Sequence, residues 1–330
     1  AASDVYKRQL DEILNDQNGT INIFGTVDME TNDISNRYGS NLNIHGTIYG
    51  GVANFGTTTL YDGCNNYLAN IRNTGSEGIV TGQIVLSEDC NNVHNIFVSH
   101  QDEIDTGGNA ILKAFNGRGS VIQQEQSVVV TVEGSDNPDN PYVYSLDNSG
   151  NSATFNGSNL TIQVKEGTYA IIKLGSGNVT VTSLGATDDN HVNITFTGLT
   201  FTASNGYEYA QLRVSNFYDT TFTDCTFNNV WLPTSGTIGV EGTYTVTGCT
   251  FTLKDSSYDS YAVNLTKANV VFTDNTISGY QRGFCINTRD GGEENVTISR
   301  NTFSEINNES GGYAIQLTFE SAGTEVDITD

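Results

Sequence analysis

A six-residue phrase recurs along the second half of this chain of 330 residues. Its first copy reads Phe-Thr-Gly-Leu-Thr-Phe at 196–201. The apolar residues that close the five copies lie at spacings of 26, 24, 26 and 26 residues, and they are Phe201, Phe227, Phe251, Ile277 and Phe303. A fixed period of this size, with no helical pattern inside it, is typical of a solenoid, whose repeats pack on their neighbours.

The two apolar positions of each phrase predict a corner in the backbone. They are five residues apart, which is the wrong parity for one strand with a single buried face. A turn between them resolves the parity, and Gly and Asp are suitable turn residues. Arg300 departs from this preference, and the five corner positions are Gly198, Asp224, Gly248, Asp274 and Arg300.

Each coil also carries a strand with alternating apolar residues before its phrase. These pairs are Leu212/Val214, Ile238/Val240, Val263/Leu265, Phe284/Ile286 and Ile315/Leu317. Two or three strands in coils of about 24–26 residues leave no room for a helix. We therefore predict an all-β fold, a right-handed single-stranded parallel β-helix, with the right-handed winding that parallel crossovers prefer.

Stacking of the coils places like residues above one another. The closing apolar residues form a column inside, and a second column at the corner contains Leu199, Cys225, Cys249, Asn275 and Asn301. Asn at a corner can hydrogen-bond the backbone of its own and the next coil. Cys225 and Cys249 are close enough for a bridge, but the column also accepts Leu and Asn, so we expect two buried free thiols.

The rest of the chain is expected to belong to the same solenoid. Helical spacing of apolar residues between Val5 and Leu14 predicts a short capping helix in an N-terminal segment of residues 1–18. We expect the β-helix to span 19–330, irregular to about residue 158 and regular from 159. Ile44, Ile71 and Ile96 lie at spacings of 27 and 25 residues and indicate that the period continues there.

Both ends of the sequence suggest that it is a fragment. The chain begins without Met, and residues 1–9 are similar to a translated sequencing adapter. Ile328-Thr329-Asp330 reads as the opening half of another phrase. We therefore expect a chain cut at both ends, with no signal peptide in the sequence at hand.

Composition excludes several partners. The chain has 14 basic and 38 acidic residues, a net charge of −24, whereas nucleic acids and anionic membranes attract clustered Lys and Arg. No apolar stretch approaches the length of a membrane span. The five Cys, at 64, 90, 225, 249 and 285, lack metal-ligand spacing, which makes zinc unexpected. We predict no cofactor, with calcium as an unsupported alternative.

The outward columns of the predicted strands offer little chemistry. One column is Arg213, Gly239, Asn264, Cys285 and Gln316, nearly all neutral. Glycoside hydrolysis needs two carboxylates across the bond, and the column supplies none. Carboxylates in the loops around Asp255, Asp259 and Asp290 could bind calcium or act as acid and base, although acidic loop residues are far more often only solvated. The four His show no nucleophile partner and are interpreted as structural.

Aromatic residues give the better indication of a site. Trp231, Tyr244, Tyr258 and Tyr280 fall at coil ends or loops in the predicted coils. Exposed rings beside Asn and Asp can stack on sugar faces. The more frequent role of such rings is packing against the solenoid.

The recurrent Val/Ile-Thr-x-Asn-Thr-Phe phrase, seen best at Ile298–Phe303, resembles the right-handed parallel β-helix repeats of the pectate-lyase-like superfamily. The resemblance covers 159–330 well and 19–100 loosely. It implies the fold and leaves the activity open, because that superfamily includes lyases, hydrolases, phage tail spikes and noncatalytic adhesins. The polygalacturonase motifs Asn-Thr-Asp, Gly-His-Gly and Arg-Ile-Lys are absent, so no catalytic residue is carried over.

These observations favour a secreted or cell-surface bacterial β-helix that is adhesin-like or binds glycans. The expected partner is a polysaccharide or a host or cell-surface glycan, with no nucleic acid and no membrane insertion. A polysaccharide lyase or glycoside hydrolase acting on acidic or plant or mucosal polysaccharide is the alternative, and a phage tail-spike fragment is the third. Three outward carboxylates beside an Arg or Lys would favour the enzyme, and a flat Thr/Asn face with exposed aromatics would favour binding.

Overall fold

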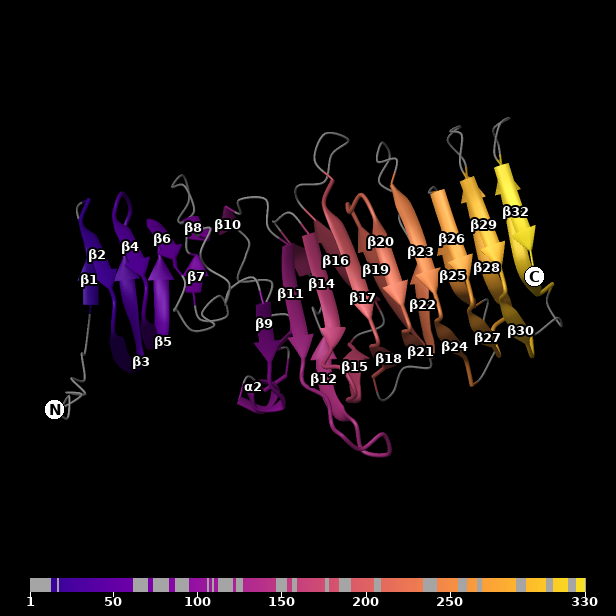
Figure 1. The fold of residues 1–330 in the computed structure, drawn as a ribbon, viewed down its shortest axis with the longest axis horizontal. Coiled ribbons are helices and arrows are strands. Elements are labelled where there is room, and N and C mark those ends of the chain that lie inside the picture. Colours follow the sequence, from indigo (N-terminus) through magenta and orange to yellow (C-terminus); the bar gives the residue numbers. More distant parts are fainter. Residues whose placement is uncertain are drawn as a thin grey trace. The chain divides into compact units, whose positions relative to one another are not determined.

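In the computed structural model, most of the described residues form strands, and these strands are arranged in parallel sheets (Figure 1). It forms two compact units, an N-terminal unit (1–97, 113–129 and 155–158) and a C-terminal unit (98–112, 130–154 and 159–330). The residues that the structure describes are 13–16, 18–61, 71–73, 83–86, 95–105, 107–108, 110–111, 121–122, 127–146, 153–155, 159–175, 178–183, 191–204, 209–233, 242–254, 260–265, 269–288, 295–306, 311–319 and 325–329.

Three parallel sheets are built mostly from residues of the C-terminal unit, and each regular coil gives one strand to each. The first sheet contains β9 (Asn95–Val98), β11 (Ser127–Val132), β14 (Asn159–Val164), β17 (Asn193–Thr197), β20 (Thr220–Thr223), β23 (Thr243–Thr247), β26 (Asn269–Thr273), β29 (Asn295–Ser299) and β32 (Glu325–Thr329). The second contains β12 (Tyr142–Leu146), β15 (Ala170–Leu174), β18 (Thr200–Ala203), β21 (Thr226–Asn228), β24 (Thr250–Thr252), β27 (Thr276–Ser278) and β30 (Thr302–Ser304). The third contains β13 (Ala153–Phe155), β16 (Asn178–Ser183), β19 (Ala210–Ser215), β22 (Val230–Pro233), β25 (Tyr261–Leu265), β28 (Arg282–Thr288) and β31 (Tyr313–Phe319). The predicted right-handed parallel β-helix is confirmed.

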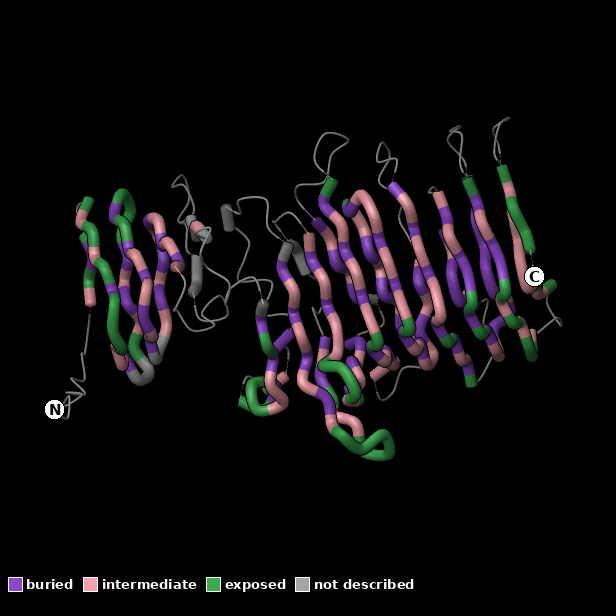
Figure 2. The backbone as a smooth tube through the Cα atoms, in the orientation of Figure 1, coloured by how far each residue is buried: buried purple, intermediate pink, exposed green. Residues whose placement is uncertain are grey.

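The repeated phrase sets the register of these coils. Phe201 pairs with Phe227, and Phe227 pairs with Phe251, in adjacent strands of the second sheet. Their rings stack at centroid distances of 5.3 and 4.6 Å and are fully buried. Buried and partly exposed residues alternate along most strands (Figure 2), because successive side chains of a strand point to opposite faces. The aromatic column therefore forms the core.

The predicted corner is a backbone turn with positive φ in all five coils. The φ values are 67° at Gly198, 53° at Asp224, 66° at Gly248, 59° at Asp274 and 52° at Arg300. This region favours Gly and tolerates Asp and Asn, which explains the corner composition. Arg300 is held by a paired contact, since its Nε and Nη2 donate to the two carboxylate oxygens of Asp274 at 2.6 Å each. These hydrogen bonds lower the pKa of Asp274.

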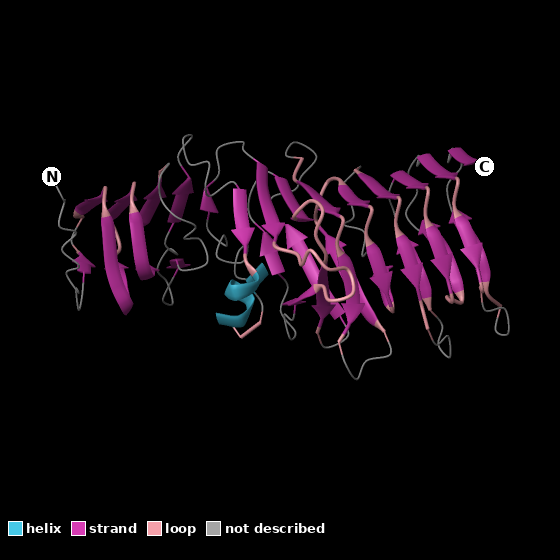
Figure 3. Cartoon of the chain, turned by 60° about the horizontal axis from the view of Figure 1, so that its bottom comes forward, coloured by secondary structure: helices cyan, strands magenta, loops and turns pink. Residues whose placement is uncertain are grey.

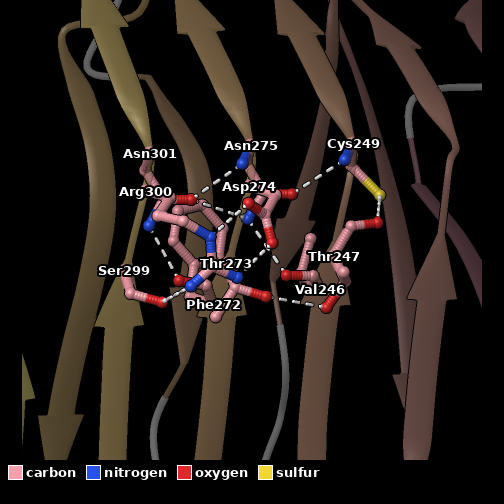
Figure 4. Close-up of polar contacts among 10 residues, drawn as sticks. All are labelled: Val246, Thr247, Cys249, Phe272, Thr273, Asp274, Asn275, Ser299, Arg300 and Asn301. Carbon is pink, nitrogen blue, oxygen red and sulfur yellow. Dashed lines mark hydrogen bonds and ion pairs between the residues drawn. The ribbon is translucent and has the colours of Figure 1, made fainter. Parts of the chain in front are cut away.

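The polar corner column is a hydrogen-bonded ladder (Figure 4). The backbone N–H of Cys249 donates to Asn275 Oδ1, and that of Asn275 donates to Asn301 Oδ1, both at 2.9 Å. The Asn275 carboxamide also donates to Val246 O at 3.0 Å. The Cys249 thiol takes the equivalent place one coil earlier and approaches Phe222 O at 3.6 Å. Asn and Cys therefore satisfy the corner carbonyls in the same way.

A second hydrogen-bonded ladder joins the starts of neighbouring strands in the first sheet. Its bonds run between the coils in the opposite direction to those of the corner column. Here the side chain of one coil accepts from the backbone N–H of the next coil. Asn193 Oδ1 accepts from Asp219 N at 3.0 Å, and Asp219 Oδ1 accepts from Thr243 N at 2.8 Å. The same arrangement joins Asn269 to Asn295. Asx residues at the starts of these strands thus join pairs of consecutive coils.

Cys225 and Cys249 are free buried thiols, as predicted. Burial, and then the hydrogen bond with Cys249, raises the pKa of the Cys225 thiol. Because both thiols are buried and so closed to the reagent, we expect neither to be alkylated by N-ethylmaleimide in the folded protein and both to be alkylated in guanidinium chloride. Peptide mapping by mass spectrometry measures each site. Rapid labelling of the folded protein at Cys249 would contradict this packing.

The N-terminal unit has two parallel sheets and shorter coils than predicted. One sheet contains β1 (Ile13–Asn15), β3 (Thr26–Asn36), β5 (Thr47–Asn54) and β7 (Ile71–Asn73). The other contains β2 (Thr20–Ile23), β4 (Asn41–Ile44), β6 (Thr57–Leu60), β8 (Gln83–Leu86) and β10 (Val121–Ile122). Thr20 pairs with Asn41 and Asn41 with Thr57, which are 21 and 16 residues apart. The spacing of Ile44 and Ile71 therefore does not mark one coil period as predicted, because these residues lie in different sheets.

Helix is scarce and differs from the prediction. Ile13 and Leu14, the end of the predicted capping helix, belong to β1, while residues 1–12 lie outside the described residues. A short helix not anticipated from the sequence, α2 (His100–Asp105), lies in the C-terminal unit (Figure 3). Its start has reciprocal bonds between Ser99 and Asp102, which is the pattern of a capping box. The Ser-x-x-Asp spacing could have indicated it.

Candidate binding surface

An aromatic cluster lies on the outer face of the third sheet. Trp231 projects from β22, Tyr261 begins β25 and Tyr209 directly precedes β19. Their neighbours Val230, Leu232 and Ala210 are fully buried, so the alternation of each strand turns the rings outward. We call Tyr209, Trp231, Tyr261 and Arg282 the aromatic cluster.

The rings of the cluster contact one another in sequence. Tyr209 stacks on Trp231 with centroids 4.8 Å apart and planes 12° apart. Trp231 meets Tyr261 edge to face at 6.0 Å. The Arg282 guanidinium lies 4.8 Å from the centre of the Tyr261 ring and also donates to its hydroxyl. Arg282 pairs in register with Tyr313, whose exposed fraction is 49%.

The indole N–H of Trp231 is buried and has no hydrogen-bond partner among the described residues. Leaving a buried donor unsatisfied costs about 1–3 kcal/mol. The Trp231 side chain as a whole is partly exposed, whereas its N–H is covered by the surrounding side chains. An incoming oxygen acceptor would remove that cost, which makes this donor the feature of the cluster that points to a ligand.

The neighbouring outward side chains are neutral amides and a second Arg. Gln211 pairs in register with Trp231, and its Oε1 accepts from Arg213 Nε and Nη2 at 3.2 and 3.1 Å. Further along, Cys285 is 6% exposed and its thiol lies 3.8 Å from Gln316 Oε1. The expected neutral outer column is thus present at these positions.

For one strand of that column, the prediction from the sequence chose the wrong residues. The coil between β19 and β25 uses β22, whose Leu232 pairs with Val263, in place of the predicted Ile238/Val240 strand. The Asn229 corner with φ of 56° turns the chain directly from β21 into β22, so the third-sheet strand comes early in this coil. Residues 234–241, including Gly239, lie outside the described residues.

Two of the predicted sugar-contact aromatics are buried. Tyr280 has an exposed fraction of 0% and its hydroxyl donates to Val230 O at 2.7 Å. Tyr244 is 4% exposed, because it occupies an inward position of β23 in register with Thr220 and Val270. Burial raises the pKa of both hydroxyls. The prediction of surface positions for Tyr244 and Tyr280 is therefore wrong, while Trp231 is partly exposed.

The remaining candidate residues lie outside the described residues. They are Asp255, Asp259 and Asp290, the candidate carboxylates, and Tyr258, the fourth candidate aromatic. Within the described ranges, no group of three or more His, Cys, Asp or Glu residues could hold a metal ion.

A pair of carboxylates was missed by the sequence analysis, and both are used structurally. Glu103 is 6% exposed, and its two oxygens accept from Ser145 N at 2.6 Å and Ala110 N at 2.8 Å. Glu133 accepts from His100 N at 2.8 Å. Burial, and then the charges of Glu133 and Glu103, raise the pKa of the nearby Tyr144. The bond between Glu103 and Ser145 attaches α2 to β12.

Each described histidine stacks on aromatic rings of neighbouring coils. His45 lies between Phe24 and Tyr61 at 4.6 and 3.9 Å. His191 stacks on Tyr218 at 3.6 Å. His100 stacks on Tyr142 at 4.2 Å. Packing of this kind agrees with the structural role expected for histidines, and His94 lies outside the described residues.

The cluster residues that the sequence analysis missed are Tyr209, Tyr261 and Arg282. Tyr209 and Tyr261 each stand next to an alanine that begins the buried alternation of a third-sheet strand. The recurring Tyr-Ala dipeptide, about one coil away from Trp231 on either side, could have identified these two tyrosines from the sequence.

Comparison with known proteins supplies no function, so a functional proposal must rest on the fold and the aromatic cluster. No protein-family model, curated protein or solved structure matches this chain. Among the described residues, no helix is long and apolar enough to cross a membrane.

Proposed function

We propose that this protein is a noncatalytic, glycan-binding β-helix of the pectate-lyase-like superfamily that acts outside the cell or at its surface. The observation that carries the proposal is the aromatic cluster with its unpartnered Trp231 indole N–H. A polysaccharide or a host or cell-surface glycan is the proposed partner. The superfamily assignment is supported by the parallel coils and by the phrase that ends at Phe303.

The chemistry of the cluster suits a sugar ring. The apolar C–H face of a pyranose packs well on Trp and Tyr rings, while these residues keep a polar edge for hydrogen bonds. Sugar hydroxyls can supply the acceptor that the Trp231 N–H lacks. Gln211 and Arg213 lie on the same face within the register of Trp231, and they offer amide and guanidinium groups to ring substituents.

The same face favours binding over cleavage. A glycosidase needs two carboxylates about 5–10 Å apart across the scissile bond. The described outward residues nearest to Trp231 are Tyr209, Gln211, Arg213 and Tyr261, none of which is a carboxylate. A site built from these residues can hold a glycan in place but has no acid and base pair of its own.

Replacing Trp231 with alanine is expected to weaken glycan binding by at least tenfold, about 1.4 kcal/mol, because a central aromatic of a contact surface is lost. Trp231→Phe should retain part of the affinity, since it keeps an aromatic ring while it removes the N–H and part of the stacking area of the indole. The recombinant chain is run by affinity electrophoresis against a panel of neutral and uronate-containing polysaccharides. Tyr218→Ala, which removes a partly exposed ring stacked on His191, is the matched control.

The outcome also separates binding from catalysis. Reducing ends and the absorbance of unsaturated products are followed on the same panel, with and without calcium. Retarded migration without new products supports the proposal. Cleavage that is lost in Asp255→Ala or Asp259→Ala would replace it with a lyase or hydrolase function.

A further inference from the structure

Two cysteines are stacked at the corner between the first and second sheets. The strands before the corner fix their register, since Thr223 pairs with Thr247. Cys225 and Cys249 therefore occupy the same place in consecutive coils, and the backbone N–H of Thr250 donates to Cys225 O at 2.9 Å. Neighbouring parallel strands lie about 4.8 Å apart. This spacing is within the Cα separation of about 4.4–6.8 Å that a disulfide spans.

The two side chains also point in the same direction. Each cysteine is 1% exposed, and each thiol lies 3.4 Å from the carbonyl oxygen of the threonine two residues before it. Each thiol also approaches a phenylalanine carbonyl of the preceding coil, at 3.5 Å for Cys225 and 3.6 Å for Cys249. The two thiols are hydrogen-bonded to each other as well. Sulfur atoms in this arrangement can bond after a small rotation about χ1.

Elsewhere in this column, asparagine links one coil to the next. Asn275 accepts a hydrogen bond from Cys249 N, and its carboxamide donates to Asn301 Oδ1, each at 2.9 Å (Figure 4). A thiol is only a weak donor and a weak acceptor, so Cys249 gives Cys225 a much weaker link. A covalent bond between the two sulfur atoms would supply at this corner the connection that the carboxamides make further along.

Among the described cysteines, these two form the single stacked pair. Cys285 lies on the outer face of the third sheet, where it pairs in register with Asn264 and Gln316. Its neighbours in the adjacent coils are therefore amides and not cysteines. Cys64 and Cys90 lie outside the described residues.

We infer that Cys225 and Cys249 close an inter-coil disulfide when the chain folds in an oxidising compartment. The two free thiols described above are then the reduced state of this pair. Disulfides form and persist outside the cell, and that setting rests on the proposed function, whereas the pairing itself rests on the register of the two coils. The bond joins the coil of β22, which carries Trp231, to the coil of β25, which begins with Tyr261.

The reaction is thiol–disulfide exchange with a small disulfide, oxidised glutathione. The thiolate of one cysteine attacks a sulfur of the glutathione disulfide, which forms a mixed disulfide and releases one glutathione thiolate. The thiolate of the second cysteine then attacks the cysteine sulfur of the mixed disulfide and releases the second glutathione. Two cysteine thiols are oxidised, one glutathione disulfide is reduced, and the two protons pass to the released glutathiones.

The exchange takes place during folding and not in the finished fold. Both thiols are buried, and burial raises the pKa of the Cys225 thiol, so the packed corner is closed to glutathione. While the coil of β23 and β24 is still docking, both thiols are accessible and the same register brings them together. Once the corner has packed, its burial shields the bond from reductants in the same way.

The test is refolding of the reduced full chain from guanidinium chloride in a glutathione redox buffer. Free thiols are then blocked with N-ethylmaleimide in guanidinium chloride, and a non-reduced digest is mapped by mass spectrometry. We expect the bond between Cys225 and Cys249 to exceed every other pairing of either residue by at least about tenfold, because the register holds these two thiols together. The same chain oxidised while unfolded is the reference, and it should give a mixture of pairings among the five cysteines.

A second readout is the midpoint of unfolding in guanidinium chloride, compared between the oxidised and the reduced chain. The bond should raise the midpoint, because it joins residues 24 positions apart (225 to 249) and restricts the unfolded state. Cys249→Ala should abolish both the bond and the difference between the two midpoints. Cys285→Ala is the matched control and should keep both. Comparing oxidised with reduced samples of one variant removes the direct effect of each substitution on stability.

Two results would overturn the inference. The first is free thiols at Cys225 and Cys249 in the refolded chain under a glutathione ratio that oxidises the unfolded chain. The second is a bond from either residue to a third cysteine in preference to its partner. Glycan binding through Trp231 is measured separately on the reduced chain, so its failure leaves this test unaffected.

Discussion

Phe227→Ala is expected to lower the free energy of unfolding of the C-terminal unit by about 3–5 kcal/mol. Phe227 is fully buried and its ring lies between those of Phe201 and Phe251. It also meets Phe222 edge to face at 5.6 Å. Truncation leaves a cavity that the flanking rings cannot fill, because the parallel backbone holds them at fixed positions. In a solenoid, a defect in one coil also weakens both neighbouring interfaces.

The measurement is unfolding in guanidinium chloride followed by the fluorescence of Trp231, the single tryptophan of the chain. Trp231 lies in β22, the strand that follows the β21 strand of Phe227, so it reports on the affected coil. Phe227→Leu is the conservative control and should cost less than half as much, since most of the volume remains. Equal midpoints for the alanine variant and the unmodified chain would mean that this column is not the core.

Asn275→Ala also has a large expected effect, a loss of about 2–6 kcal/mol in the free energy of unfolding. The carboxamide is 1% exposed, accepts from Cys249 N and donates to Val246 O. Its removal leaves a buried donor and a buried acceptor without partners, at about 1–3 kcal/mol each. The carboxamide's own bond to Asn301 Oδ1, at 2.9 Å, is lost as well, but that oxygen stays paired because the backbone N–H of Asn275 keeps its bond to it.

Asn228→Ala is the matched control for this variant. Asn228 ends β21, and its side chain is partly exposed. Substitutions at such surface positions usually change stability by no more than about 0.5 kcal/mol. Thermal melts of the two variants are compared by circular dichroism. A similar melting temperature in both would show that the ladder contributes no more than an outer-face side chain.

The sequence predicted the regular coils because parity and period leave few alternatives there. The corner at Gly198 and the thiols at Cys225 and Cys249 follow from a phrase that must place two apolar residues inward, five positions apart. The N-terminal unit was harder to predict, because its two-stranded coils vary in length. The spacing between Ile44 and Ile71 resembles the coil period there without reflecting it. The helix α2 was missed because it is short and is held by Glu103 through tertiary contacts.

The candidate site was less predictable than the fold. Trp231 was identified, but its partners depend on where β22 begins, and the apolar pair Ile238/Val240 competed with the correct strand. Tyr244 and Tyr280 were misplaced for a related reason, since an aromatic near a coil end can point inward or outward. Alternation decides this only when the strand start is known.

The two ladders of the C-terminal unit have a consequence for the order in which the chain is made. At the strand starts, Asn193 already holds an acceptor for the N–H of Asp219 before that coil has emerged from the ribosome. At the corner, the N–H of Cys249 gains its acceptor only when Asn275, 26 residues later, has been synthesised. The preceding coil therefore offers hydrogen-bond acceptors to each new coil. The following coil supplies the acceptors that its corner still lacks. Synthesis from the N-terminus delivers these partners in the order that the growing edge requires.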